Sequence, residues 1–152
     1  EIVFDDSNKK DERWYRNTGE SFVFADGVVT ASYGTAIAKD HADRNGTDED
    51  GVELDPVVVI EGLKTQLIRD LKSQVSNELA RTDWYITRNT EKSIAIPSAI
   101  STHRDLVRSR QATMEAQITN AADTPALETL HTYTTTDGVK SRPLGELPVL
   151  ES

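Results

Sequence analysis

Acidic side chains are dense in one polar segment, residues 39–55, and clustered carboxylates of this kind suggest cation binding. A calcium loop of the EF-hand type needs oxygen ligands at fixed offsets around a central glycine and closes on a glutamate. Placing either Gly46 or Gly51 at the central position puts a valine at the closing position, so the pattern is not met. A loose cation site is the weaker alternative, formed by Asp43, Asp48 and Asp50.

The side chains that most often carry catalysis form no known pattern in this chain. His41, His103 and His131 lack the spacing of zinc ligands, and the chain has no cysteine. Neither a Gly-x-Ser-x-Gly elbow nor a Gly-x-x-x-x-Gly-Lys phosphate loop is present. We therefore expect no metal, no cofactor and no enzymatic activity, and we keep a small hydrolase acting on host-surface material as a remote alternative.

Four residues of the middle region are better suited to protein contacts than to chemistry. Trp84 follows the longest amphipathic pattern, where its ring either closes a helical core, the default for so large a side chain, or anchors a partner. Asp83 is expected to cap the helical turn that follows. Arg104 and Arg108 lie four residues apart and so share a helix face, which is either solvated or bound by acidic groups, Asp83 among them.

Two long segments have the apolar spacing of amphipathic helices. Asp55 and Pro56 form a start signal, which predicts a first helix over residues 56–82. Its apolar stripe consists of Ile60, Leu63, Leu67, Leu71, Val75 and Leu79. A second helix is predicted over residues 97–119, with apolar positions at Ile100, Val107, Met114 and Ile118. Short helices are predicted between the two, to about residue 91, and after Asp123-Thr124-Pro125.

The remaining segments are expected to be extended or irregular. Asp26-Gly27 lies between two short apolar runs and predicts a β-hairpin. The expected organisation is a β-hairpin arm (1–38), an acidic loop (39–55), a helical interaction domain (56–134) and an extended C-terminal tail (135–152). The expected fold is thus mainly α (α+β), a small helical hairpin or bundle preceded by the arm. Three leucines of the tail are expected to contact neighbouring protein: Leu144, Leu147 and Leu150.

The charge of the chain, −9 over 152 residues, is concentrated near its beginning. Residues 1–55 carry 14 acidic and 6 basic side chains, whereas residues 56–118 carry 7 acidic and 9 basic ones. Because an acidic surface repels phosphate, we expect no nucleic-acid partner, and without an apolar run of about 18 residues we expect no membrane partner. The chain starts at Glu1 with no apolar signal region, which suggests synthesis in the cytoplasm and a native N-terminus that was longer or trimmed.

A set of residues around the end of the first helix and along the second resembles the C-terminal module of phage tail-fibre assembly and tail assembly chaperone-like proteins. These residues are Leu79-Ala80-Arg81-Thr82-Asp83-Trp84, Arg88, Pro97, His103-Arg104 and Val107-Arg108. In that family a helix ends in Leu-Ala-x-Thr/Ser-Asp-Trp, and a second helix carries an aromatic-arginine pair followed by another arginine. Here His103 replaces the aromatic residue, and the family's closing Trp-Pro has no counterpart. The resemblance covers roughly residues 67–133, under half of the chain.

The resemblance implies a small helical module from a phage tail gene. We expect a tail-associated virion structural protein, an adaptor at the baseplate, tail tip or fibre attachment, which binds other tail proteins in several copies after assembly in the host cytoplasm. The main alternative is a tail-fibre assembly chaperone that leaves the mature particle. The hairpin arm and the acidic loop are additions that a minimal chaperone does not need.

Overall fold

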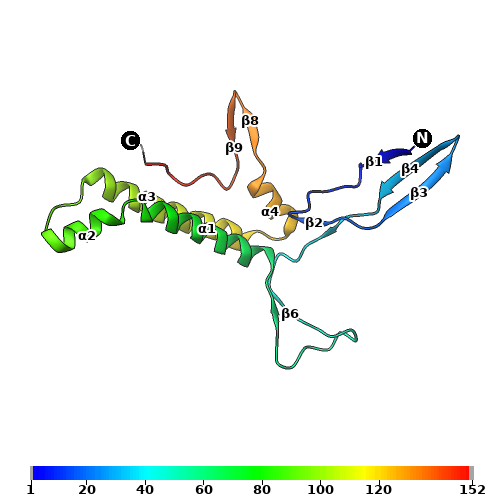
Figure 1. Ribbon diagram of the computed structural model, residues 1–152, viewed down its shortest axis with the longest axis horizontal. Coiled ribbons are helices and arrows are strands. Elements are labelled where there is room, and N and C mark those ends of the chain that lie inside the picture. Colours follow the sequence, from blue (N-terminus) through cyan, green and yellow to red (C-terminus); the bar gives the residue numbers. More distant parts are fainter. Residues whose placement is uncertain (1, 151–152) are drawn as a thin grey trace.

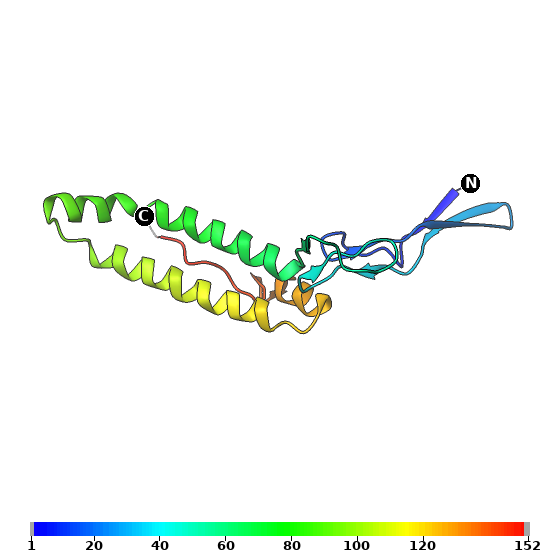
Figure 2. The ribbon, with the colours of Figure 1, turned by 90° about the horizontal axis from the view of Figure 1, so that it is seen from below.

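The computed structural model describes residues 2–150, and it has an elongated helical body from which β-strand arms extend (Figure 1). Its helices are α1 (Leu63–Ala80), α2 (Asp83–Lys92), α3 (Ser98–Asn120) and α4 (Thr124–His131). Figure 2 shows α1 and α3 lying side by side as an antiparallel pair, with α2 at the far end of the body. The arms leave the body at the opposite end, where α1 begins and α4 lies.

The core lies along the seam between α1 and α3, as the apolar spacing predicts. Leu63, Leu67, Leu71 and Val75 of α1 are buried, and so are Ile100, Val107, Met114 and Ile118 of α3. Five residues from outside the two helices complete it: Trp14, Tyr15, Ala121, Leu127 of α4 and Leu144 near the C-terminus. Asp123 caps α4 by accepting a hydrogen bond from the backbone N–H of Ala126 at 2.8 Å.

A three-stranded sheet forms the N-terminal arm: β1 (Ile2–Asp5), β3 (Glu20–Ala25) and β4 (Val28–Tyr33). The central strand is β4, which pairs parallel with β1 and antiparallel with β3. The predicted hairpin is confirmed, because Asp26 and Gly27 both have positive φ, as the tight turn between β3 and β4 requires. The parallel addition of β1 follows no local signal in the sequence.

Three further strand pairs are short and antiparallel. The pair β2 (Tyr15–Arg16) with β5 (Ile37–Ala38) connects the N-terminal arm to the body. The pair β6 (Arg44–Asn45) with β7 (Val59–Ile60) closes a second arm, residues 44–60. A hairpin of β8 (Thr134–Thr136) and β9 (Val139–Ser141) follows α4, with Asp137 and Gly138 at its turn.

The fold is α+β, and the expectation of a mainly α fold is therefore wrong. Helices make up 40% of the chain and strands 21%, the latter divided among several small sheets. Strands occur in the segment expected to be a loop (39–55) and in the segment expected to be an extended tail (135–152). Each of these strands has only two or three residues, too few for a period-two apolar pattern to be recognised.

The start of the first helix also differs from the prediction, since α1 begins at Leu63 and not at Pro56. All four residues from Val57 to Ile60 are β-branched, and such residues favour strands over helices. Its last two residues form β7, which pairs with β6 and leaves Ile60 exposed. Among the described residues, no helix combines the length and apolar character needed to cross a membrane.

Candidate protein-interaction site

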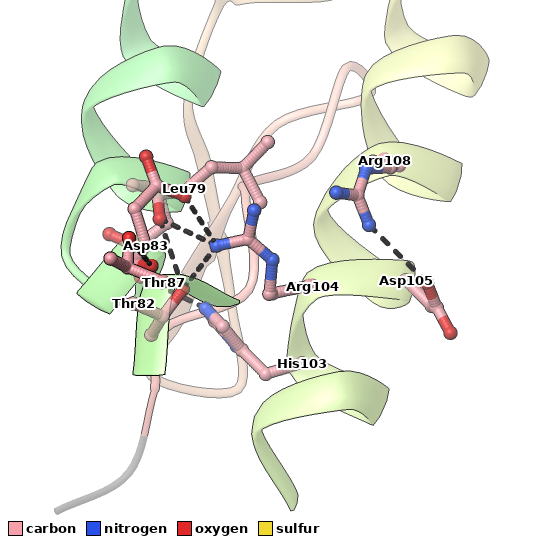
Figure 3. Close-up of polar contacts among 9 residues, drawn as sticks. Leu79, Thr82, Asp83, Thr87, His103, Arg104, Asp105 and Arg108 are labelled. Carbon is pink, nitrogen blue, oxygen red and sulfur yellow. Dashed lines mark hydrogen bonds and ion pairs between the residues drawn. The ribbon is translucent and has the colours of Figure 1, made fainter. Parts of the chain in front are cut away.

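Arg104 of α3 organises a cluster of polar groups at the corner between α1 and α2 (Figure 3). Its Nη1 atom lies 2.8 Å from the carbonyl oxygen of Leu79, 2.7 Å from Oγ1 of Thr82 and 2.9 Å from Oδ1 of Asp83. The Arg104 residue is only 8% exposed, whereas the Asp83 carboxylate is largely open to solvent. This cluster joins Thr82, Asp83 and Arg104, three of the residues that carry the family resemblance.

The position of Arg104 follows from the chemistry of helix ends. The last carbonyl groups of α1 have no partner within the helix, and a cation near them is favoured by the helix dipole. Arg104 supplies both a donor and a positive charge. Asp83 is the first residue of α2 and not its N-cap, so the expectation that it caps this helix is wrong; its carboxylate binds Arg104 and stands in the first turn, where a negative charge is favoured. Next to them, Nε2 of His103 lies 3.0 Å from Oε1 of Glu78. The cluster thus fixes the angle between two helices.

Arg108 has a different environment from Arg104, although the two are four residues apart. Its side chain is exposed, and its Nη1 atom lies 3.4 Å from Oδ1 of Asp105 on the same helix, apart from the groups that bind Arg104 (Figure 3). Arg104 is bound by Asp83, as one of the sequence interpretations proposed. The two arginines therefore do not form one cationic surface.

Trp84 lies at the surface of the helical tip, which contradicts the interpretation that its ring closes the core. The residue is 51% exposed, and its ring stacks on that of Tyr85 at a centroid distance of 3.8 Å. The guanidinium carbon of Arg88 lies 4.7 Å from the centroid of the Trp84 ring. Trp, Tyr and Arg are the residues most enriched at protein-binding hot spots. The tip therefore presents groups suited to binding a protein.

The C-terminal segment packs along its own helical body. Leu144 is buried in the core, and Leu147 is partly buried against it. Arg110 of α3 holds this segment, because it donates hydrogen bonds to the carbonyl oxygens of Leu144 and Glu146, each at 3.1 Å. Leu150 borders a shallow hollow together with Leu106 of α3. Leu150 and Leu147 are thus the tail leucines nearest the surface.

The largest exposed apolar surfaces lie on the two arms, and the sequence reasoning did not single them out. The N-terminal arm exposes Ile2, Val3, Phe4, Phe22, Val23 and Phe24. The second arm exposes Val52, Leu54, Val57, Val58, Val59 and Ile60. The sequence does contain one signal for such a surface. Phe22 and Phe24 are two residues apart on a strand, so both side chains point to the same face of the sheet.

Two carboxylates of the acidic segment, residues 39–55, accept hydrogen bonds from backbone N–H groups. Oδ1 of Asp43 accepts hydrogen bonds from the N–H of Gly62 at 2.8 Å and from the hydroxyl of Thr65 at 2.7 Å. Oδ1 of Asp48 accepts from the N–H groups of Asp50 and Val52. Within residues 2–150, no three side chains of His, Cys, Asp or Glu are grouped to hold a metal ion.

Comparisons with protein-family models, with curated proteins and with solved structures gave no match.

Proposed function

We propose that the chain is a tail-associated virion structural protein of a bacteriophage, without enzymatic activity, which joins neighbouring tail subunits at the baseplate, tail tip or fibre attachment. The observation that carries the proposal is the exposure of apolar side chains on two arms that project from a small helical body. Exposed apolar patches of this kind usually mark protein-binding surfaces. Arms of this shape reach subunits on more than one side.

The phage part of the proposal rests on the resemblance around Thr82, Asp83 and Arg104. A signature that defines a structural module should consist of residues that support one another physically. Here these three residues meet in one cluster that fixes the corner between α1 and α2. The aromatic tip that follows, with Trp84 and Arg88, adds a third surface for a partner.

Mass spectrometry of particles purified from the phage that encodes the chain tests the proposal directly. We expect the chain in mature particles at a copy number that is a multiple of three or six, as symmetric tail rings require. A chain that is present in infected-cell lysate and missing from mature particles would instead identify a tail-fibre assembly chaperone. Hydrolysis of cell-wall or glycan material by the purified chain would contradict the non-enzymatic role.

A further inference from the structure

One face of the N-terminal sheet collects every phenylalanine of the chain. Residues that pair across neighbouring strands point to the same side of a sheet. Phe4 and Phe22 both pair with Ala31, while Ile2 and Phe24 both pair with Val29, two residues earlier on β4. We call the surface formed by these side chains the Phe face: Ile2, Phe4, Phe22, Phe24, Val29 and Ala31. The opposite face carries Val3, Val23 and Thr30 in one row and Asp5, Ser21 and Ser32 in the next.

Residues 2–150 leave the Phe face almost uncovered. Phe4 is 66% exposed, Phe22 64% and Phe24 73%, whereas Ala31 between Phe4 and Phe22 is buried. Both views show the sheet projecting beyond the body, away from α1 and α3 (Figures 1 and 2). A sheet this small needs an apolar surface to pack against, because it cannot bury its own aromatic side chains.

We propose that the Phe face packs against the Phe face of a second copy of this chain, so that two N-terminal sheets stack into a sandwich. Neither of the two rows that form the face contains a charged side chain. Stacking these rows against those of a second copy therefore buries no charged group of the rows. Asp5 belongs to the opposite face and Asp26 to the turn. Glu20 points to the same side as the phenylalanines, but it lies in the next row, paired with Tyr33 at the end of the sheet nearest the body. This inference goes beyond the proposed function, since it concerns the contact between two copies and not the identity of the assembly.

The area of the Phe face is sufficient for such a contact. A phenylalanine buries on the order of 200 Å² when fully covered, so three of them, about two-thirds exposed, offer roughly 400 Å² per copy. Ile2 and Val29 enlarge this area, and two copies together reach about 1,000 Å², the lower limit for a stable interface. Because the sheet projects from the end of the molecule, two stacked sheets leave the helical bodies apart (Figure 1).

Sedimentation of the purified full chain with two matched double variants tests the proposal. Phe4→Thr with Phe22→Thr alters the Phe face, and Val3→Thr with Val23→Thr alters the adjacent positions of the same strands on the opposite face. Threonine retains a high strand propensity in both. We expect wild type and the valine variant to form dimers, and the dissociation constant of the phenylalanine variant to rise by about 100-fold or more. Circular dichroism melting curves show whether the helical body remains folded in each variant.

Cross-linking provides a second readout in which all three phenylalanines are retained. The chain lacks cysteine, so Val29→Cys and Thr30→Cys each introduce a single thiol, on the Phe face and on the opposite face respectively. Packed sheets lie about 10 Å apart, which a bis-maleimide of similar length spans. We expect covalent dimers from Val29→Cys and few from Thr30→Cys.

Three results would overturn the proposal. The first is a wild-type chain that remains monomeric at about 0.1 mM, because its dissociation constant would then be too high for assembly. The second is an equal rise of the dissociation constant in the two double variants, and the third is an equal yield of cross-linked dimer from the two single-cysteine variants. None of these results bears on whether the chain is found in phage particles, so the failure of this inference is distinguishable from the failure of the proposed function.

Discussion

At the scale of single residues, Arg104 is the side chain on which the geometry of the helical tip depends most. Its Nη1 atom contacts three oxygens at the corner between α1 and α2. We expect Arg104→Met to lower the free energy of unfolding by about 2 kcal/mol, because hydrogen bonds to a charged group contribute roughly 1.5–3 kcal/mol and Asp83 remains partly hydrated. Urea denaturation followed by circular dichroism measures this change.

Arg108→Met is the matched control, since it makes the same substitution one helical turn away on an exposed side chain. We expect its free energy of unfolding to stay within about 0.5 kcal/mol of wild type. Equal effects of the two substitutions would show that the buried cluster does not contribute as described.

Trp84 contributes little to the stability of the isolated chain in this structure. Half of the residue is exposed, and its main contact is the stacked ring of Tyr85. We expect Trp84→Ala to lower the free energy of unfolding by about 1 kcal/mol or less, the value of an aromatic pair. The buried Met114 is the reference, for which Met114→Ala should cost about 2–5 kcal/mol. A loss of similar size at Trp84 would show that its ring is part of the core.

His131 makes stability depend on pH in a known direction. Burial lowers the pKa of His131, the hydrogen bond with the Leu127 carbonyl opposes this, and the charges of Arg13 and Arg142 lower the pKa further. Because the folded-state pKa lies below the unfolded value of about 6.5, protonation favours the unfolded chain. The contribution of His131 to stability is therefore complete above about pH 6.5 and is lost as the pH falls below that value through the lower folded-state pKa.

The variant His131→Asn isolates this effect, since its amide retains a donor for the Leu127 carbonyl. We expect the urea midpoint to fall less between about pH 7.5 and pH 5.5 in the variant than in wild type. Other titrating groups contribute equally to both proteins and cancel in the difference. Parallel pH profiles would exclude the assigned role of His131.

How well the environment of a residue could be predicted from the sequence depended on how far along the chain its partners lie. Asp83 was a candidate partner for Arg104 because only a few residue types bind a guanidinium well. Trp84 was placed in the core by its size alone, but α2 turns the ring outward onto Tyr85. That orientation depends on the corner built by Arg104, which local sequence does not encode.

At the scale of elements, the N-terminus of α1 is held from a distant part of the chain. Gly62 provides no side-chain cap, and the Asp43 carboxylate takes this place by accepting from Gly62 and Thr65. The hydrogen bond from Thr65 lowers the pKa of Asp43 most, and the one from Gly62 lowers it further. The carbonyl groups of Asp40 and His41 accept from Leu63 and Lys64. The start of α1 therefore depends on the base of the second arm.

We expect Asp43→Ala to loosen the first turn of α1 without unfolding the body. The N–H group of Gly62 loses its acceptor, so hydrogen exchange at Gly62 and its neighbours should become several-fold faster. Asp48→Ala is the control, because Asp48 accepts hydrogen bonds only within the second arm. Unchanged exchange at Gly62 in Asp43→Ala would show that the cap is not formed in solution.

Elements with local start signals were predictable, and elements fixed by distant contacts were not. The Asp123 cap and the apolar spacing of α3 gave two helices close to their observed bounds. Asp55-Pro56 gave a false helix start because pairing of β7 with β6 outweighs a local signal. The Asp137-Gly138 turn was visible in the sequence, but its flanking strands are too short and polar to be recognised.

At the scale of the whole molecule, stability and contact surfaces are separated along the long axis. The core lies between α1 and α3, whereas the exposed apolar side chains lie on arms at one end of this body. The negative charge follows the same division, since residues 1–55 carry 14 acidic and 6 basic side chains. A partner of the arms therefore meets an apolar surface surrounded by negative charge.

This charge distribution predicts how ionic strength affects the stacking of two Phe faces. Two copies bring together two acidic N-terminal regions, whose repulsion opposes association when salt is low. The Debye length falls from about 30 Å at 0.01 M salt to about 8 Å at 0.15 M, so salt screens this repulsion while the apolar contact is retained. We expect the dimer dissociation constant, measured by sedimentation, to decrease several-fold over this range. A dissociation constant that rises with salt would mean that opposite charges, and not the apolar side chains of the Phe face, hold the contact together.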